Sequence, residues 1–152
     1  MQNIIYRKLE PKDLNTFIEM RIRQLQEEGA EPTFDLSPDL QDYYNRHIAD
    51  ETFVSWLALD NDIIVGTSGI SITERPPYYG NRTGKTGILS SMFTLTEYRR
   101  KGIAKTLLTK IIAEAKTRNC KMIQISASDM GMLLYRNFGF VKNDHFMQYK
   151  IV

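Results

Sequence analysis

The stretch 88–115 constrains the fold of this chain most, because the period of its apolar residues changes within it. Residues 88–95 form a short, apolar and partly β-branched run, which predicts a strand, and the polar residues 96–101 end it. From Ile103 the apolar residues recur at three- and four-residue spacing, which predicts a helix with one buried face. The chain is therefore expected to pass from a strand through a basic turn into a helix that begins at Gly102.

The turn before this helix has the composition of an anion-binding site. It consists of Arg99, Arg100, Lys101, Gly102, Ile103 and Ala104. A helix start leaves several backbone N–H groups without intrahelical partners and carries partial positive charge, and three cationic side chains stand beside it here. Gly102 and Ala104 are small, which lets the backbone approach a diphosphate closely. The chain contains neither of the phosphate loops G-x-x-x-x-G-K-S/T and G-x-G-x-x-G, which disfavours nucleoside triphosphates and nicotinamide dinucleotides.

Two motifs follow one another along the chain. Arg99, Gly102 and Ala104 match the pattern Q/R-x-x-G-x-G/A. Residues 128–140 are similar to N-x-x-A-x-x-L-Y-x-x-x-G-F, with departures at Ser128 and Gly131. Each motif falls on the expected element, about a helix and a strand apart. In this order they resemble the two motifs of the GNAT superfamily of N-acetyltransferases, and the resemblance covers roughly residues 52–140.

The resemblance implies an α/β fold of the α+β kind, with a mixed, mostly antiparallel central sheet that is flanked by helices and contains a splayed pair of parallel strands. The spacing of apolar residues and turn residues along the chain agrees with this fold. We expect strands at 4–7, 53–59, 63–72, 87–95, 122–126 and 146–152, and helices that begin near 11, 38, 103 and 130. The turn 60–62 predicts a hairpin. The strand 122–126 follows a helix and should lie parallel to 87–95 through a right-handed crossover.

Composition favours one globular domain over residues 1–152. At 152 residues, with 42% hydrophobic and 25% charged residues, the chain can bury a core without disulfides or a metal ion. The single Cys120 is expected to pack as a small apolar side chain rather than to act as a nucleophile. The N-terminus is too polar for a signal peptide, and no apolar run reaches the length of a membrane span. We therefore expect a cytoplasmic protein without a membrane partner.

The resemblance also implies how acetyl-CoA, the acyl donor, is held. Its pantetheine arm is expected between the splayed strands, where it pairs with the backbone of Met92, Phe93 and Thr94. One N–H there is expected to face the thioester oxygen. The pyrophosphate is expected on the turn 99–104, and Ser128 completes the expected binding residues. Tyr135 is the expected catalytic residue, as a hydrogen-bond donor to the departing thiolate.

The acceptor is expected to be a primary amine of a small molecule or a peptide, which attacks the thioester directly. The residues leave the general base open among Glu28, Glu74, Asp129 and His145. The acceptor pocket is expected between Arg21 and the segments 27–34, 73–86 and 142–145. The oligomeric state is open as well, with a homodimer among the alternatives.

Two other functions compete with this interpretation. A sensor or interaction module could keep the acyl-CoA cleft and lose turnover, which the departures at Ser128 and Gly131 favour. A nucleic-acid-binding domain could use the basic strip from Arg99 to Lys110. The net charge of only +2 and the lack of aromatic residues between the basic ones argue against that partner.

Overall fold

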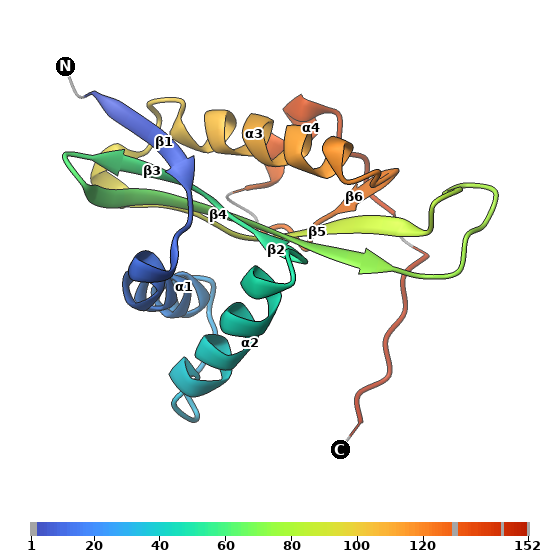
Figure 1. The fold of residues 1–152 in the computed structure, drawn as a ribbon, viewed down its shortest axis with the longest axis horizontal. Helices are drawn as coiled ribbons and strands as arrows, with labels where there is room; N and C mark the ends of the chain where they lie inside the picture. Colours follow the sequence, from blue (N-terminus) through green and yellow to red (C-terminus); the bar gives the residue numbers. More distant parts are fainter. Residues whose placement is uncertain (1–2, 129–130, 144, 152) are drawn as a thin grey trace.

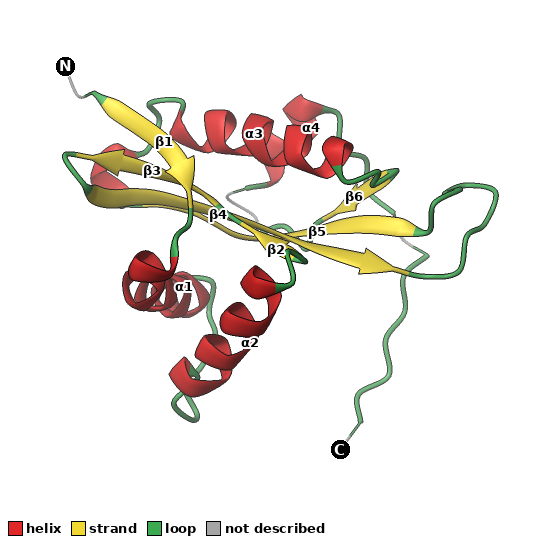
Figure 2. Cartoon of the chain, in the orientation of Figure 1, coloured by secondary structure: helices red, strands yellow, loops and turns green. Residues whose placement is uncertain are grey.

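A computed structural model describes residues 3–128, 131–143 and 145–151 of the chain. In this part of the chain the elements follow in the order β1 (Ile4–Lys8), α1 (Leu14–Glu27), α2 (Ser37–Ala49), β2 (Phe53–Val54), β3 (Trp56–Asp60), β4 (Ile63–Glu74), β5 (Lys85–Thr94), α3 (Ile103–Thr117), β6 (Met122–Gln124) and α4 (Met132–Phe138). Two short 3-10 turns, Pro11–Asp13 and Thr96–Tyr98, precede α1 and α3. Figure 2 shows that helices and strands make up separate layers.

The sheet is mixed. Its strands lie in the order β1-β3-β4-β5-β6. The short strand β2, directly before β3 in the chain, also pairs with β4, further along that strand. All pairs are antiparallel except β5 with β6, which is parallel. The predicted hairpin is present, since β3 pairs with β4 next to the turn at Asn61 and Asp62. The predicted fold class is confirmed.

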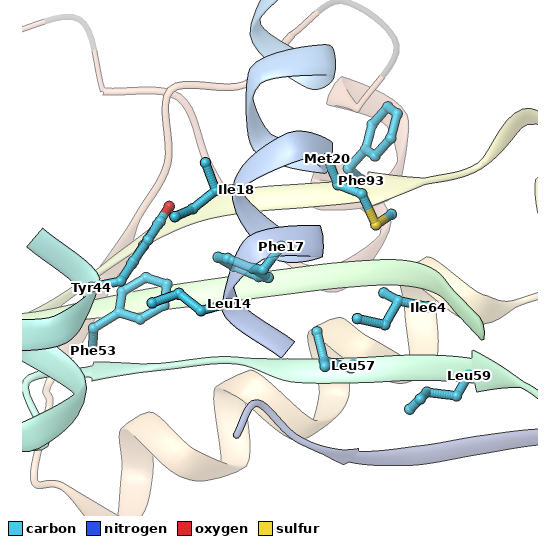
Figure 3. Close-up of a cluster of buried hydrophobic side chains, with 10 residues drawn as sticks. All are labelled: Leu14, Phe17, Ile18, Met20, Tyr44, Phe53, Leu57, Leu59, Ile64 and Phe93. Carbon is cyan, nitrogen blue, oxygen red and sulfur yellow. The ribbon is translucent and has the colours of Figure 1, made fainter. Parts of the chain in front are cut away.

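Helices cover both faces of this sheet. The helices α1 and α2 pack on one face and α3 and α4 on the other (Figure 1). On the first face, Phe17 of α1 packs beside Tyr44 and Phe53, with its ring centroid 5.1 Å from that of Tyr44 and 6.2 Å from that of Phe53 (Figure 3). On the second face, Leu107 and Ile111 of α3 are fully buried. Two apolar layers thus hold the central strands in place.

The first strand is tied to the start of α1 by an ion pair. Arg7 of β1 donates two hydrogen bonds to the carboxylate of Asp13, over 2.7 and 2.9 Å. The backbone N–H of Glu10 also donates to this carboxylate, over 2.9 Å. The hydrogen bond from Arg7 is the main reason why the pKa of Asp13 lies below its usual value.

Several predicted boundaries differ from the structure, and one predicted strand is wrong. The predicted strand 53–59 is divided into β2 and β3, and the strand predicted at 122–126 ends at Gln124. The strands β4 and β5 extend to Glu74 and Lys85, so the loop between them is shorter than the predicted 73–86. Met130, where a helix was predicted to begin, lies outside the described residues, and α4 spans Met132–Phe138. Residues 146–151, predicted as a final strand, form no strand, since the chain there has no neighbouring strand within the described residues.

Candidate active site

A bulge in β5 marks the centre of the candidate site. Thr67 pairs with Phe93 and Gly69 with Ser90, so two residues of β5 lie opposite one residue of β4. The first of the two, Ser91, has a φ of 57°, in the left-handed region. The hydroxyl of Thr67 donates to the carbonyl of Ser91 over 2.6 Å and closes the bulge.

Beyond this bulge, β5 is separate from β6. The parallel pairing of the two strands ends at Ile88 and Gln124, whereas β5 continues to Thr94. Since Phe93 pairs with β4, the alternation of an extended strand directs the backbone of Met92 and Thr94 to the opposite edge. The expected splayed pair of strands is therefore present. The backbone groups of Met92 and Thr94 lie along the edge of β5 that β6 leaves open.

Two carbonyl groups at this edge already accept hydrogen bonds. Gln24 donates from Nε2 to the carbonyl of Met92 over 3.2 Å, and Arg99 donates from Nε to the carbonyl of Thr94 over 2.8 Å. Each of these two carbonyl groups therefore already has one hydrogen-bond donor within the protein, a side chain of α1 for Met92 and a side chain of the basic turn for Thr94. The third expected residue, Phe93, buries its side chain in the core under α1.

A polar chain on α1 leads from this strand to the protein surface. Gln24 is 6% exposed, and its Oε1 accepts a hydrogen bond of 3.1 Å from Arg21. Its Nε2 also donates to Oε1 of Glu28 over 3.2 Å. The carboxylate of Glu28 is exposed. Arg21 and Glu28, both expected near the acceptor, therefore lie within two hydrogen bonds of the backbone of Met92.

Tyr135 on α4 is the buried phenol of the site. Its side chain is 6% exposed and its ring centroid lies 5.5 Å from that of Phe140. Burial raises the pKa of Tyr135 to about 12, and the negative charge of Glu28 adds to this effect. The phenol therefore keeps its proton at every physiological pH, which makes it a hydrogen-bond donor rather than a strong acid.

The two departures from the second motif have structural reasons. A Cβ on Gly131 would lie 2.9 Å from Cε2 of Tyr135, so this glycine makes room for the ring. Ser128 accepts hydrogen bonds from the N–H of Gly131, at its carbonyl over 3.1 Å and at its hydroxyl over 3.3 Å. Ser128 thus fixes the chain directly before α4, so its hydroxyl is already engaged within the protein.

The basic turn exposes its charges and strains its backbone. Arg100, Lys101 and Gly102 are exposed. The φ of Arg100 is 62° and that of Gly102 is 82°, and nothing lies within 4 Å of a Cβ built on Gly102. The first helical hydrogen bond of α3 runs from the N–H of Thr106 to the carbonyl of Gly102. The N–H groups of residues 103–105 precede it and have no acceptor within the helix.

Of the cationic side chains in this turn, Arg99 belongs to the protein framework. Besides the carbonyl of Thr94 it binds Oε2 of Glu27 over 3.1 Å, and its guanidinium lies 5.7 Å from the ring centroid of Phe93. Lys101 lies 5.6 Å from the ring of Tyr98. The geometry therefore favours phosphate binding by the backbone of the turn, with Arg99 as the residue that positions it.

Several expected acceptor residues lie elsewhere. Glu74 pairs with Lys85 at the end of β4 and β5 opposite to the bulge, and the loop between them is fixed there by Asn81, which donates to the carbonyl of Lys85 over 3.0 Å. His145 lies in the exposed C-terminal segment. Asp129, another candidate base, lies outside the described residues. Of the three candidate bases within the described residues, Glu28 is the one that these contacts bring to the bulge.

A hollow of about 270 Å³ lies at the C-terminal end of α1, and Glu28 is not among its lining residues. It lies between the end of α1 and the segment 30–36, with Leu25 and Phe34 among its apolar lining residues. This segment includes most of the predicted acceptor loop 27–34. Sequence reasoning missed Gln24, although a signal was present: it follows Phe17 by seven residues and so is a polar residue on the buried face of α1.

Comparison with known proteins identifies the class of this fold and site. A model of the acetyltransferase (GNAT) family matches residues 16–140. A predicted acetyltransferase from Clostridium acetobutylicum, solved with acetyl-CoA, is 35% identical over 97% of this chain and 96% of its own, with a TM-score of 0.94. The comparison with curated proteins gave no match.

Two further structures share the fold at lower identity. A GCN5-related N-acetyltransferase from Ralstonia eutropha is 20% identical over 97% of this chain and 99% of its own, with a TM-score of 0.89. A glucosamine-6-phosphate N-acetyltransferase from Arabidopsis thaliana is 16% identical over 99% and 100%, with a TM-score of 0.75. The chain thus belongs to the GNAT acetyltransferase family and is an acyl-CoA-dependent N-acetyltransferase.

No helix in the described ranges combines the length and the apolar character that crossing a membrane requires.

Proposed function

We propose that this protein transfers the acetyl group of acetyl-CoA to a primary amine of a small molecule or a peptide, by direct attack of the amine. The observation that carries this proposal is the hydrogen-bond chain from Met92 through Gln24 to Glu28, at the point where β5 has left β6. It brings an open strand edge and an exposed carboxylate to the same place.

The donor site would be built from two parts of the chain. The N–H groups of 103–105 and the exposed turn before them would hold the pyrophosphate, since a helix start favours an anion. The edge of Met92 and Thr94 would hold the pantetheine arm through backbone hydrogen bonds. The N–H and the carbonyl of one residue in an extended strand point to the same edge, so the N–H of Met92 faces the open side. The residues present therefore fit acetyl-CoA.

Bound acetyl-CoA supplies a thioester carbonyl as the electrophile. The N–H of Met92 would donate to the thioester oxygen and stabilise the negative charge that develops there. Glu28 would take a proton from the acceptor ammonium, directly or through water, because a lysine-like amine has a pKa of ~10.4 and attacks only when neutral. Arg21 and Gln24 would fix the position of the Glu28 carboxylate relative to β5.

Tyr135 would donate a hydrogen bond to the departing sulfur. With a pKa of about 12 for Tyr135, full proton transfer to a thiolate is unfavourable. Against a thiol pKa of ~8.5 the difference amounts to about 5 kcal/mol. A hydrogen bond from a phenol that stays protonated still stabilises the charge on sulfur, and the free thiolate can collect its proton from water after it leaves.

A panel of amines offered together with acetyl-CoA tests this proposal. Release of free thiol, followed with a thiol reagent, should depend on the amine and be abolished without it, and the panel should include amino sugars, aminoglycosides, polyamines and peptides with free N-termini or lysines. Glu28→Gln should reduce the amine-dependent rate, whereas Glu19→Gln, at an exposed glutamate of α1 that does not line the hollow, should not. Binding of acetyl-CoA without turnover on any amine would instead support a sensor.

A further inference from the structure

The hollow at the C-terminal end of α1 is lined mainly by apolar side chains. Ile22 and Leu25 of α1 and Leu36 before α2 are half-buried, and Ile22 also packs against the buried core on this face of the sheet. Pro32 and Phe34 line it as well, and the side chain of Phe34 is 67% exposed. Side chains of this kind favour a ligand with an apolar group that removes them from water.

The charged side chains at this hollow are both negative. Glu31 and Asp35 line it and are exposed, whereas no lysine or arginine in the described part of the chain lines it. An apolar surface with two carboxylates beside it complements a cationic ligand that carries an apolar group. The same carboxylates disfavour a ligand that carries a carboxylate of its own.

The hollow is joined to the polar chain of α1 through Leu25. This residue follows Arg21 by four positions and precedes Glu28 by three, which makes it a neighbour of both on the helix surface. Directly after Glu28 the chain turns back, and the N–H of Ala30 donates to the carbonyl of Leu25 over 2.9 Å. The hollow therefore begins about one helical turn from the proposed base.

The volume of the hollow suits one small group rather than a whole ligand. It measures about 270 Å³. Pockets that enclose a drug-sized ligand measure roughly 300–1,000 Å³. A phenyl ring or a branched alkyl group fits the apolar lining, whereas an amino sugar would place its hydroxyl groups against side chains that offer them no hydrogen bond.

We infer that this hollow selects the acceptor by holding a compact apolar group of a cationic primary amine without a carboxylate, such as an arylalkylamine, while the amine nitrogen lies at Glu28. The inference rests on the proposed acetyl transfer to a primary amine and narrows the acceptor within that class. Burial of a phenyl-sized group should raise kcat/KM on the order of 10-fold to 100-fold over an amine without it.

Two matched pairs of amines, offered to the full chain with acetyl-CoA, test this inference. In the first pair, 2-phenylethylamine and ethanolamine differ in a phenyl or a hydroxyl group on the same two-carbon frame. In the second pair, phenylalaninamide and phenylalanine differ in the negative charge of the carboxylate. The values of kcat/KM, followed by release of free thiol, should be higher for the first member of each pair.

Two alanine variants show whether the hollow is the cause of this preference. Ala30→Leu places a larger side chain at the hollow and should reduce the ratio of kcat/KM between 2-phenylethylamine and ethanolamine to about 1. Ala113→Leu, at an exposed alanine of α3 that does not line the hollow, should keep the wild-type ratio. Circular dichroism should show a folded chain in both variants, because both alanines are exposed.

The outcomes separate this inference from the proposed function. Turnover of amines without the expected preference, or a preference that persists in Ala30→Leu, would overturn the selection by the hollow and leave acetyl transfer intact. Turnover confined to amines that lack an apolar group would do the same. If acetyl-CoA binds and no amine of the pairs or of the wider panel releases thiol, acetyl transfer is wrong and the inference is wrong with it.

Discussion

The side-chain amide of Gln24 donates to the main-chain carbonyl of Met92 over 3.2 Å, and thereby joins the last turn of α1 to the bulge of β5. The same nitrogen donates to Glu28 over 3.2 Å, one helical turn further along α1. Gln24 thus fixes the distance between the edge of β5 and the proposed base, Glu28.

Replacement of Gln24 by leucine should impair turnover more than folding. Leucine keeps much of the volume but leaves the partly buried carbonyl of Met92 without its donor, and the loss of such a hydrogen bond costs about 0.5–1.5 kcal/mol. We expect kcat/KM to fall on the order of 10-fold to 100-fold, while the melting temperature falls only modestly. Asn15→Leu, at an exposed amide on the same helix that does not line the hollow, is the control and should leave both quantities near wild type.

The sequence predicted the parts of this site that depend on local geometry. The basic turn at Gly102 could be predicted because a helix start with a small residue has a recognisable pattern, and Tyr135 because it lies in a motif. Glu28 could be proposed only as one of four candidate bases. The choice of Glu28 among these candidates depends on contacts between α1 and β5. The contacting residues Gln24 and Met92 are 68 positions apart in the sequence.

The C-terminal segment shows what the sequence could not predict. Its alternation predicted a strand, but a strand also needs a neighbouring strand, and none pairs with this segment within the described residues. The bulge at Ser91 was likewise beyond prediction, because a serine with a φ of 57° is held there by the register of β4 and the hydroxyl of Thr67.

Gly102→Val should weaken the binding of acetyl-CoA more than Arg100→Ala. At a φ of 82°, a branched side chain strains the backbone by about 1–2 kcal/mol and blocks the approach of a diphosphate. Arg100 is an exposed charge that its neighbours can replace. Titration calorimetry gives the affinities, and unchanged affinity in a folded Gly102→Val protein would contradict phosphate binding at this turn.

A control for strain alone is available at the same position. Asparagine tolerates the left-handed conformation far better than valine. Gly102→Asn should therefore restore the melting temperature. If it restores stability and still binds acetyl-CoA more weakly than wild type, the loss comes from the blocked approach to the backbone.

Gly131→Ala should reduce turnover through Tyr135. The new Cβ would lie 2.9 Å from Cε2 of the ring, so the ring has to shift and the phenol moves with it. The backbone itself is not strained, since the φ of Gly131 is −82°. We expect a loss in kcat of about 10-fold. The double variant with Tyr135→Phe decides the cause: if the glycine acts through the phenol, the two losses are not additive.

Asp13→Asn should destabilise the protein at neutral pH and lose this effect in acid. The hydrogen bond from Arg7 lowers the pKa of Asp13 below its ordinary value. A group with a lowered pKa stabilises the fold above its unfolded pKa of ~3.9 and loses that contribution as the pH falls through the folded value. Denaturation curves from pH 7 to pH 2 should therefore converge. Asp42→Asn, which removes an exposed pair with Arg46, should show a much smaller difference at pH 7.

Tyr135→Phe should separate the chemical role of the phenol from its packing. Phenylalanine keeps the buried ring and its contact with Phe140 but removes the hydrogen-bond donor. Turnover at saturating substrates should fall on the order of 10-fold to 1000-fold, while the affinity for acetyl-CoA and the melting temperature at pH 7 stay close to wild type. Full turnover in this variant would exclude the proposed role, and a lost fold would favour a packing role instead.

The same variant has a signature in alkaline solution that does not depend on turnover. Because the pKa of Tyr135 is raised to about 12, mainly by burial, the protonated phenol stabilises the fold. This contribution is complete below the unfolded pKa of ~10 and is lost as the pH rises through the folded value. The wild type should therefore lose more stability between pH 10 and pH 12 than Tyr135→Phe does. Denaturant unfolding across this range measures the difference, and parallel curves would show that the phenol is not buried as the structure has it.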